Sequence, residues 1–436
     1  MLLPYGAIIK FKMVPAFDKS SICSIAAFFG CMIISGRNLR YWNGFGLAEL
    51  LISTMIISPF ITAQLNSDQI IIGSTILPAL NSYDGGSAVI EEIIKLIPFF
   101  IGRQFLSGRS DTEEILRVLV VAGLIYSFPA MFEVRFSPQL HIWIYGYFPW
   151  DNAFDQQMRA DGFRPVVFMG HGLLVSFFFC TTAVAAAAFW RTNTRAIRKL
   201  GLPSGWIAAY LCVILALCKS LGSTIYAAIV VPLVYLTKPK MQIRFAVFLT
   251  SAALLYPVLR ASDLVPTNTI LELASSVSSE RGESLETRLL NEEALLRRAS
   301  ERLWFGWGGF GRSRIYDEAG RNLSITDGIW IITLGVFGIV GFVAQFGLLA
   351  LPIYTSARAI RYANSGKDQI FLCALTLILA INILDLIPNS SIRPWTWLIA
   401  GALLGHAEAL RRGARLSKSL PMKSTDFGPI RARVRG

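Results

Sequence analysis

Long apolar runs alternate with polar stretches along nearly the whole chain. Eleven runs are close to or above the length that a helix needs to cross a hydrocarbon core of ~30 Å. In lipid such runs must be helical, because no water is present to bond their backbone groups. The pattern therefore predicts an all-α polytopic membrane protein. The predicted spans are about 20–36, 45–63, 89–102, 115–132, 166–189, 205–218, 221–237, 243–259, 329–353, 370–388 and 395–410.

Two polar loops and a polar tail interrupt this pattern and divide the chain into six parts. Hydrophobic residues make up 54% of the 436 positions, which is far from the composition of a soluble domain. The predicted parts are N-terminal transmembrane helices in 1–132, a loop in 133–165, central transmembrane helices in 166–259, a large loop with an amphipathic helix in 260–328, C-terminal transmembrane helices in 329–410 and a basic tail in 411–436.

The formal charge of +13 would suggest nucleic acid in a soluble protein, but here membrane topology explains it better. The tail is rich in Lys and Arg, so we place it in the cytoplasm. Counting back along the spans puts both polar loops on the opposite, outer side, and no nucleic-acid partner is expected. The same count puts the N-terminus outside despite Lys10, Lys12 and Lys19. A re-entrant segment at Leu2–Phe17 or a miscounted span would resolve that conflict.

Cysteine and histidine positions indicate neither a disulfide framework nor a metal site. All six cysteines fall in or at the ends of predicted spans, and none forms a Cys-x-x-Cys pair. His141, His171 and His406 are not at ligand spacing from one another.

The first polar loop, Val134–Pro165, contains an aromatic run and ends at Arg164, from which the chain re-enters the membrane through His171. Aromatic rings favour the membrane interface and also stack on sugar faces, so both interpretations stay open. The run comprises Trp143, Tyr145, Tyr147, Phe148 and Trp150.

The large loop carries most of the outer cations. They are Arg281, Arg288, Arg297, Arg298, Arg302, Arg312, Arg314 and Arg321. Leucines at helical spacing predict a helix over 284–303. Arg281 and Arg288 share a face if this helix extends back past Gly282, and Glu292 lies at i+4 from Arg288, where a salt bridge is possible. A solvated amphipathic helix lying on the membrane is the alternative. A glycine-rich segment follows, which is not a P-loop because it lacks a Gly-Lys-Ser/Thr ending.

Polar residues near span ends complete the outer face. Lys219 lies at the turn between two apolar helices, and Asp385 lies near the outer end of another span. Ionisable groups in a membrane are costly, so they suggest function, although a Lys219–Asp385 pair could simply hold helices together. Gly335, Gly338 and Gly341 predict close helix packing.

Convergence of Arg164, His171, Lys219, Arg288 and Asp327 would suit one type of chemistry, with Arg281 and Arg312 as further cations for the substrate. Arginine forks match phosphate oxygens, and Lys adds a point charge. His or Asp can take a proton from an attacking hydroxyl. The set fits displacement at a sugar carbon with a diphosphate leaving group. The arginines would do the work of a metal, since no outer Asp-x-Asp pair is present to hold one.

At these positions the sequence resembles the O-antigen polymerase and O-antigen ligase superfamily. Arg164 with Gly-His171 looks like the family's Arg…His/Asn-Pro-Asn motif at the start of a span. Lys219-Ser lies where the family often has Ser-Arg. Arg288, followed by a helix and Phe-Gly-Trp-Gly-Gly, is similar to its Arg…Pro-Leu-Gly-X-Gly segment. Thr-Asp327-Gly-Ile-Trp-Ile looks like its His-Asn-X-Tyr-Leu motif.

The resemblance covers roughly Leu119–Gly347 and implies a C-type glycosyltransferase fold in the bacterial inner membrane, with both polar loops in the periplasm. It implies a metal-independent enzyme without a cofactor that polymerises or ligates undecaprenyl-diphosphate-linked glycan in exopolysaccharide or O-antigen synthesis. Arg288 and Arg164 would bind the diphosphate. The family's base is a histidine in the slot that here holds Asp327, so Asp327 or His171 would be the base, and the missing Pro-Asn leaves the role of His171 open.

The implied partners are the lipid-linked donor, a glycan or lipid-linked acceptor, membrane lipid and other polysaccharide assembly proteins. Two other classes remain open: a transporter or flippase of lipid-linked oligosaccharide, and a non-catalytic membrane subunit of an assembly complex. A transporter would show repeated halves, broken helices and charges near the midplane. The sequence shows no internal repeat, and its polar residues concentrate at one face, which favours the enzyme.

Overall fold

The computed structural model describes residues 3–9, 17–36, 44, 46–148, 157–159, 162–197, 201–277, 279–363, 365–390 and 392–419. The regular structure of this part of the chain is helical apart from two short antiparallel hairpins. The helices are α1 (Lys19–Ser35), α2 (Leu47–Gln64), α3 (Ser82–Phe105), α4 (Arg109–Phe136), α5 (Leu140–Tyr145), α6 (Gly172–Arg191), α7 (Ser204–Leu217), α8 (Leu221–Leu236), α9 (Pro239–Ala261), α10 (Thr267–Val277), α11 (Ser279–Ser300), α12 (Ile329–Ala359), η2 (Ile360–Tyr362), α13 (Gly366–Asp385) and α14 (Pro394–Ser419). The hairpins are β1 (Ile70–Ile72) with β2 (Thr75–Leu77), and β3 (Met158–Arg159) with β4 (Gly162–Phe163).

Each of the eleven predicted apolar runs forms a helix. Among the described residues, six helices are long and apolar enough to cross a membrane: α2, α4, α6, α9, α12 (extended by η2) and α13. Helices α1, α7 and α8 are apolar but shorter. The apolar helices indicate an all-α membrane protein, while the number of spans stays a prediction.

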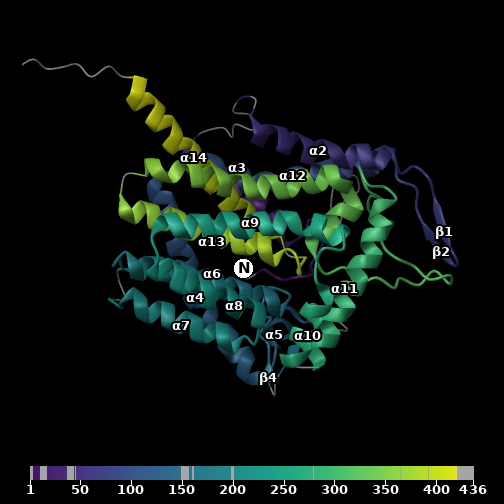
Figure 1. The fold of residues 1–436 in the computed structure, drawn as a ribbon, viewed down its shortest axis with the longest axis horizontal. Helices are drawn as coiled ribbons and strands as arrows, with labels where there is room; N and C mark the ends of the chain where they lie inside the picture. The colour runs from purple at the N-terminus through teal and green to yellow at the C-terminus, as the bar shows by residue number, and fades with distance from the viewer. Residues whose placement is uncertain are drawn as a thin grey trace, which may run out of the picture.

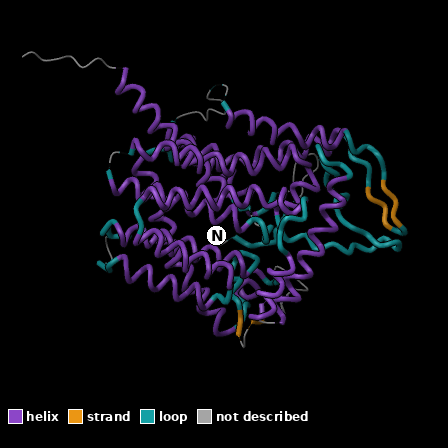
Figure 2. Tube along the Cα trace, viewed as in Figure 1, coloured by secondary structure: helices purple, strands orange, loops and turns teal. Residues whose placement is uncertain are grey.

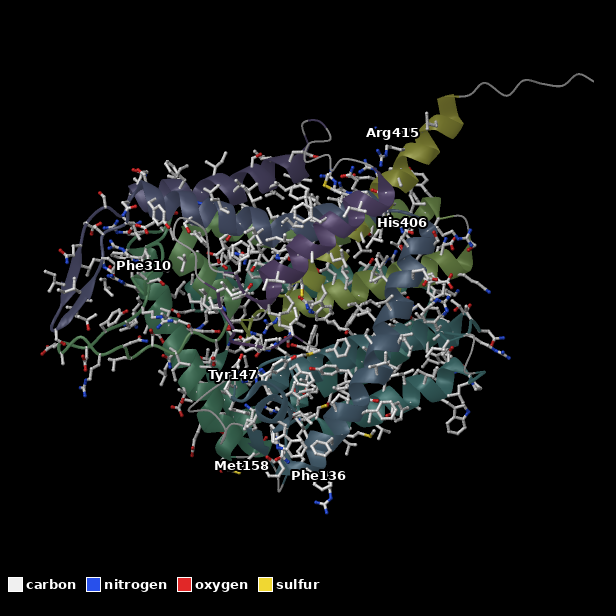
Figure 3. The ribbon with its side chains drawn as sticks, turned by 180° about the vertical axis from the view of Figure 1, so that it is seen from behind. Phe136, Tyr147, Met158, Phe310, His406 and Arg415 are labelled. Atoms are coloured by element: carbon white, nitrogen blue, oxygen red, sulfur yellow. The ribbon has the colours of Figure 1, made fainter. Side chains whose placement is uncertain are left out.

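The long helices run side by side, and the polar loops gather at one end of the bundle. Figure 1 shows α10, α11, α5 and both hairpins toward the right and lower right, whereas α14 ends at the upper left. The loops and strands in Figure 2 follow the same division. Seen from behind in Figure 3, Phe310, Tyr147 and Met158 lie toward the loop end, and Arg415 lies at the opposite end. The two arginine-rich loops therefore share one face, which we call the loop end.

The core of the bundle is formed around α6 and α13. Nearly all side chains of α6 are buried inside the protein, and 89% of its most apolar window is covered by other helices. The small residues of 183–188 let neighbouring backbones approach closely. Phe189 packs on Phe371 of α13 with ring centroids 5.1 Å apart. These two helices are therefore surrounded by protein rather than by lipid.

A buried ion network joins three helices away from the loops. Arg103 of α3 pairs with Glu49 of α2 at 2.9 Å and with Glu408 of α14 at 2.7 Å. Removing one partner of such a buried network leaves an uncompensated charge, which is strongly destabilising. The network fixes these three helices relative to one another.

Helix α12 is broken at Gly338, where φ is +67° and ψ is −168°. The glycine-rich loop fills the gap and bonds the freed backbone groups. The Trp307 and Gly308 N–H groups donate to the carbonyls of Gly335 and Val336, both at 2.9 Å. In return, the Ile339 N–H donates to the Leu303 carbonyl at 2.8 Å. Of the glycines predicted to allow close helix packing, Gly335 and Gly338 thus face a loop instead of another helix, whereas Gly341 has only Phe337 of its own helix nearby.

Replacing Gly338 should destabilise the protein because a Cβ there would lie 2.4 Å from the Trp304 backbone and would also disfavour the positive φ. We expect Gly338→Ala to lower the free energy of unfolding by about 2–4 kcal/mol. Gly222→Ala in α8 is the matched control, since nothing lies within 4 Å of its added Cβ. Thermal unfolding of the purified protein measures both, and equal midpoints for the two variants would contradict the inserted loop.

Candidate functional site

A short backbone strap at 165–171 leads from the first polar loop into α6. The buried Glu133 of α4 accepts hydrogen bonds from the Val166 N–H at 2.8 Å and the Val167 N–H at 2.6 Å. Tyr126 of the same helix accepts from the Phe168 N–H at 3.0 Å. These bonds hold Val167 at φ +47°, a conformation that a β-branched residue rarely adopts and that requires support from its surroundings. The strap thus fixes the positions of Arg164 at its start and His171 at its end.

His171 caps the N-terminus of α6 and lies among cations. Its Nδ1 accepts the Leu173 N–H at 3.1 Å, so in the neutral ring the proton is on Nε2. Burial, together with the charges of Arg164, Arg288 and Arg393, lowers the pKa of His171 to about 4. At neutral pH this histidine is therefore a neutral hydrogen-bond donor through Nε2.

Arg164 and Lys219 meet at the turn between α7 and α8. The Arg164 Nη2 donates to the Lys219 carbonyl at 3.2 Å. Lys219 has φ +53°, and its ammonium lies so close to Gly162 that a Cβ there would be 2.4 Å from Nζ. Asp385 instead accepts a hydrogen bond from Asn389 at 3.0 Å. The Lys219–Asp385 pair considered from the sequence is therefore not formed.

Arg288 of α11 pairs with Asp327, which precedes α12. The Arg288 Nε lies 3.0 Å from the Asp327 Oδ2, and each side chain is 38% exposed. The Ile325 N–H donates to Asn291 of α11 at 2.9 Å, which docks the loop that carries Asp327 onto this helix.

Glu292 is not the partner of Arg288, contrary to the i, i+4 prediction. Its carboxylate accepts from the Tyr256 hydroxyl at 2.8 Å, and burial raises its pKa. The ion pair that does form at Arg288 joins two elements far apart in sequence.

Arg393 is a fourth cation at this place, and the sequence analysis did not select it. Its charge acts on His171, and its guanidinium lies 5.5 Å from the centroid of the Tyr5 ring. A signal was present: Arg393-Pro394 precedes α14 just as Arg164-Pro165 precedes α6.

The N-terminal segment at 3–9 packs at the loop end. The Tyr5 N–H donates to His141 at 3.1 Å, and the Tyr147 hydroxyl donates to the Tyr5 carbonyl at 2.8 Å. Tyr145 and Tyr147 both pack on the His141 ring. Part of the aromatic run is therefore used in internal packing, whereas Trp143 is 62% exposed. Trp150, Lys10 and Lys12 lie outside the described residues.

Arg312, predicted from the sequence as a substrate contact, lies inside the protein instead. It is fully buried. Its Nη1 donates to the carbonyls of Asp68 at 2.7 Å and Pro78 at 2.9 Å, and its Nη2 lies 3.2 Å from the Asp68 carboxylate. Arg312 therefore ties the large loop to the segment around β1 and β2. For Arg281, α11 does extend back past Gly282, but the side chain lies outside the described part.

The structure thus brings Arg164, Lys219, His171, Arg288 and Asp327 to the loop end. The cations can hold an anion, Asp327 can accept a proton, and His171 can donate a hydrogen bond. The described residues contain no group of three or more His, Cys, Asp or Glu side chains placed to hold a metal ion.

The environment of His171 predicts a pH dependence. Because its folded pKa lies below the ordinary value of ~6.5, its contribution to stability is present above pH ~6.5 and is lost as the pH falls toward 4. NMR titration of the labelled ring should give a midpoint near 4. Arg288→Gln should raise the midpoint, and Arg297→Gln on the same helix should not. A wild-type midpoint near ~6.5 would contradict the described surroundings.

No protein-family model matches this chain, and no curated protein matches it either. The resemblance to the polymerase and ligase superfamily therefore rests on the motifs alone. A proposal about function has to be argued from the geometry at the loop end.

Proposed function

We propose that the protein is a membrane glycosyltransferase that uses a glycan linked through diphosphate to a polyprenyl lipid. The observation that carries the proposal is the Arg288–Asp327 pair beside His171 and its surrounding arginines. An anion-binding group and a proton acceptor thereby lie in direct contact. Transfer from a diphosphate leaving group needs both.

The arginines supply the donor site. Arg288, Arg164 and Arg393 act together on His171, so their charges converge on a small volume. Guanidinium groups bind phosphate oxygens through paired hydrogen bonds. The cluster lies where α6, α12 and α14 begin, at the loop end. A lipid-linked diphosphate presents its charge at the level of the headgroups, which is where helix ends of a spanning bundle lie.

Asp327 is the better candidate for the base. The Nδ1 of His171 is already used as the acceptor of the helix cap, so proton uptake there would break the bond to Leu173. Asp327 is half-exposed and has an acceptor carboxylate. In the proposed step, the acceptor hydroxyl oxygen forms a bond to the anomeric carbon, and the bond from that carbon to the diphosphate oxygen breaks. The hydroxyl proton passes to Asp327, and the electron pair leaves with the diphosphate.

Donor binding and base activation are coupled through Arg288. A half-exposed ion pair is worth only ~0–1 kcal/mol, so an incoming diphosphate can displace Asp327 from this arginine. The carboxylate is then released toward the acceptor hydroxyl. His171, neutral and protonated on Nε2, adds a hydrogen-bonding group among these cations.

The cellular setting follows from the resemblance and the charge pattern. With the basic tail in the cytoplasm, the loop end faces the periplasm of a bacterial inner membrane. The donor is then an undecaprenyl-diphosphate-linked glycan, and the product is a polymerised or ligated exopolysaccharide or O-antigen chain.

The break in α12 is the one observation that favours a transporter of lipid-linked oligosaccharide. Transporters use broken helices whose ends face a substrate cavity near the midplane. Here the freed groups on both sides of Gly338 bond the backbone of the glycine-rich loop. The charge cluster lies at one end of the bundle instead of its middle, so the enzyme is the better proposal.

Arg288→Ala should reduce glycan transfer by about 10²–10³-fold, because it removes a cation that stabilises the leaving group. Arg297→Ala is the matched control: Arg297 lies on the same helix, pairs with Glu293 and is 79% exposed. Transfer from purified lipid-linked donor is measured along with expression and thermal stability. Normal transfer by Arg288→Ala at normal stability would remove Arg288 from the site.

Asp327→Asn should separate binding from chemistry. Removing the carboxylate frees Arg288, so the donor should bind several-fold more tightly, while kcat falls by about 10²–10⁴-fold. The control is Asp317→Asn, because Asp317 lies in the same loop and pairs with Arg321. Measurements of donor affinity and kcat test this split, and an unchanged kcat in Asp327→Asn would assign the base elsewhere.

A further inference from the structure

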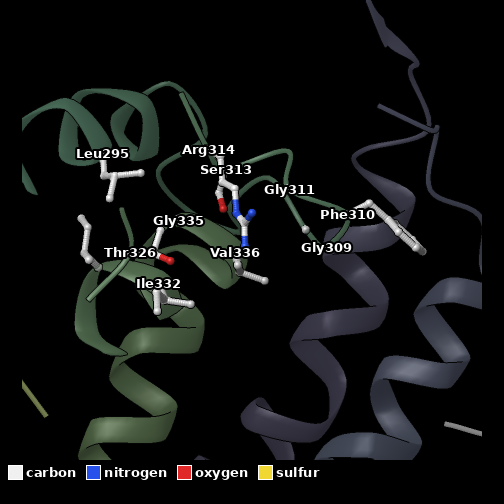
Figure 4. Close-up of a pocket in the computed structure, with 12 residues that line it drawn as sticks. Leu295, Gly309, Phe310, Gly311, Ser313, Arg314, Thr326, Ile332, Gly335 and Val336 are labelled. Atoms are coloured by element: carbon white, nitrogen blue, oxygen red, sulfur yellow. The ribbon is translucent and has the colours of Figure 1, made fainter. Parts of the chain in front are cut away.

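A cavity lies between the glycine-rich loop and the start of α12. It has a volume of about 210 Å³ and is enclosed by the glycine-rich loop at 308–314 and the first turns of α12. Thr326, the neighbour of Asp327, forms part of its wall. Figure 4 shows Thr326, Gly335 and Val336 on one side of this cavity and the glycine loop on the other.

Among the described residues, Arg314 is distinguished from the other arginines of the large loop because no acidic side chain pairs with it. Within the described residues, each of the others whose side chain is described lies in an ion pair. These pairs are Arg288–Asp327, Arg297–Glu293, Arg298–Glu301, Arg302–Asp68, Arg312–Asp68 and Arg321–Asp317. Arg314 is exposed, and the described part of the chain gives its guanidinium no acidic partner. Its side chain extends toward Val336 in Figure 4, so its charge faces the cavity.

The remaining wall combines glycines and aliphatic side chains with two hydroxyl-bearing residues, Ser313 and Thr326. The hydroxyls of Ser313 and Thr326 can bond ligand hydroxyls, and no Asp or Glu is among the lining residues. Phe310 also lines the cavity and is 59% exposed, but its ring points away from Arg314 and Thr326 in Figure 4. The glycines leave the backbone open to close approach.

Volume and charge restrict the ligand. The cavity is smaller than the ~300 Å³ at which pockets for drug-sized ligands begin, so it suits a single small unit and not a lipid chain. Arg314 gives it a net positive charge, and a guanidinium fork matches a carboxylate.

We propose that this cavity binds one acidic sugar of the acceptor glycan, with the carboxylate of a uronic acid on Arg314. The proposal rests on the proposed transferase function. Thr326 in the cavity wall is next to Asp327 in the chain, so the proposed acceptor site and the proposed base share one short segment. The site thus selects an acidic acceptor, and the cluster around His171 binds the donor.

The test is binding of a glucuronic-acid-containing trisaccharide to the full-length protein in nanodiscs, without donor. A neutral trisaccharide of glucose and a phosphorylated glucose disaccharide are the comparison probes. The acidic trisaccharide should bind at least tenfold more tightly than the neutral one, and Arg314→Gln should weaken it about tenfold. Arg321→Gln is the matched control, because Arg321 is in the same loop and 82% exposed. Ser313→Phe, which fills the cavity, should also weaken binding.

Three results would overturn the proposal: equal binding of acidic and neutral probes, unchanged binding in Arg314→Gln, or tighter binding of the phosphorylated probe. Failure here is distinguishable from failure of the transferase proposal, because the assay involves no transfer. If Arg288→Ala abolishes transfer while Arg314→Gln leaves acidic-sugar binding unchanged, only this proposal fails. If acidic-sugar binding depends on Arg314 but no transfer is detected in any variant, the cavity stands and the transferase proposal fails.

Discussion

A backbone polar group in apolar surroundings has no water to bond, and this constraint positions the large loop. The break at Gly338 leaves amides and carbonyls of α12 without helical partners, and Leu303, Trp307 and Gly308 replace them. The loop is thereby fixed to a central helix. Because α11 directly precedes this loop and the segment with Asp327 follows it, the loop limits where both of them can lie. The candidate donor site and the cavity lined by Arg314 both depend on how the glycine-rich loop bonds to α12.

Charge pairing divides the many arginines of the loop into different roles. Arg312 is buried and saturated by Asp68 and neighbouring carbonyls, so it stabilises the loop. Arg288 is half-exposed and held by a single weak pair that a diphosphate can replace. Arg314 faces a cavity without an acidic partner among the described residues. Burial and partner number, more than charge itself, separate an anchor from a candidate binding residue.

Hydropathy predicted the helices well, because a long apolar run in lipid has few alternatives to a helix. Contacts between distant segments were much harder to predict. Glu292 lies at helical spacing from Arg288, but its carboxylate accepts a hydrogen bond from Tyr256. Arg288 pairs with Asp327 instead. Arg312 pairs with Asp68, which is far away in the sequence, so the residues around Arg312 could not predict that it is buried. Arg393 could have been found from the Arg-Pro step that it shares with Arg164.

In the proposed reaction, the loop end releases a polyprenyl diphosphate as it forms a glycosidic bond. Reconstituting the protein in liposomes with a lipid-linked repeat unit and acceptor tests this most directly. The account predicts that one polyprenyl diphosphate is released for each glycosidic bond formed, in step with growth of the glycan. Movement of the intact lipid-linked unit between leaflets without release of diphosphate would contradict it and identify a transporter.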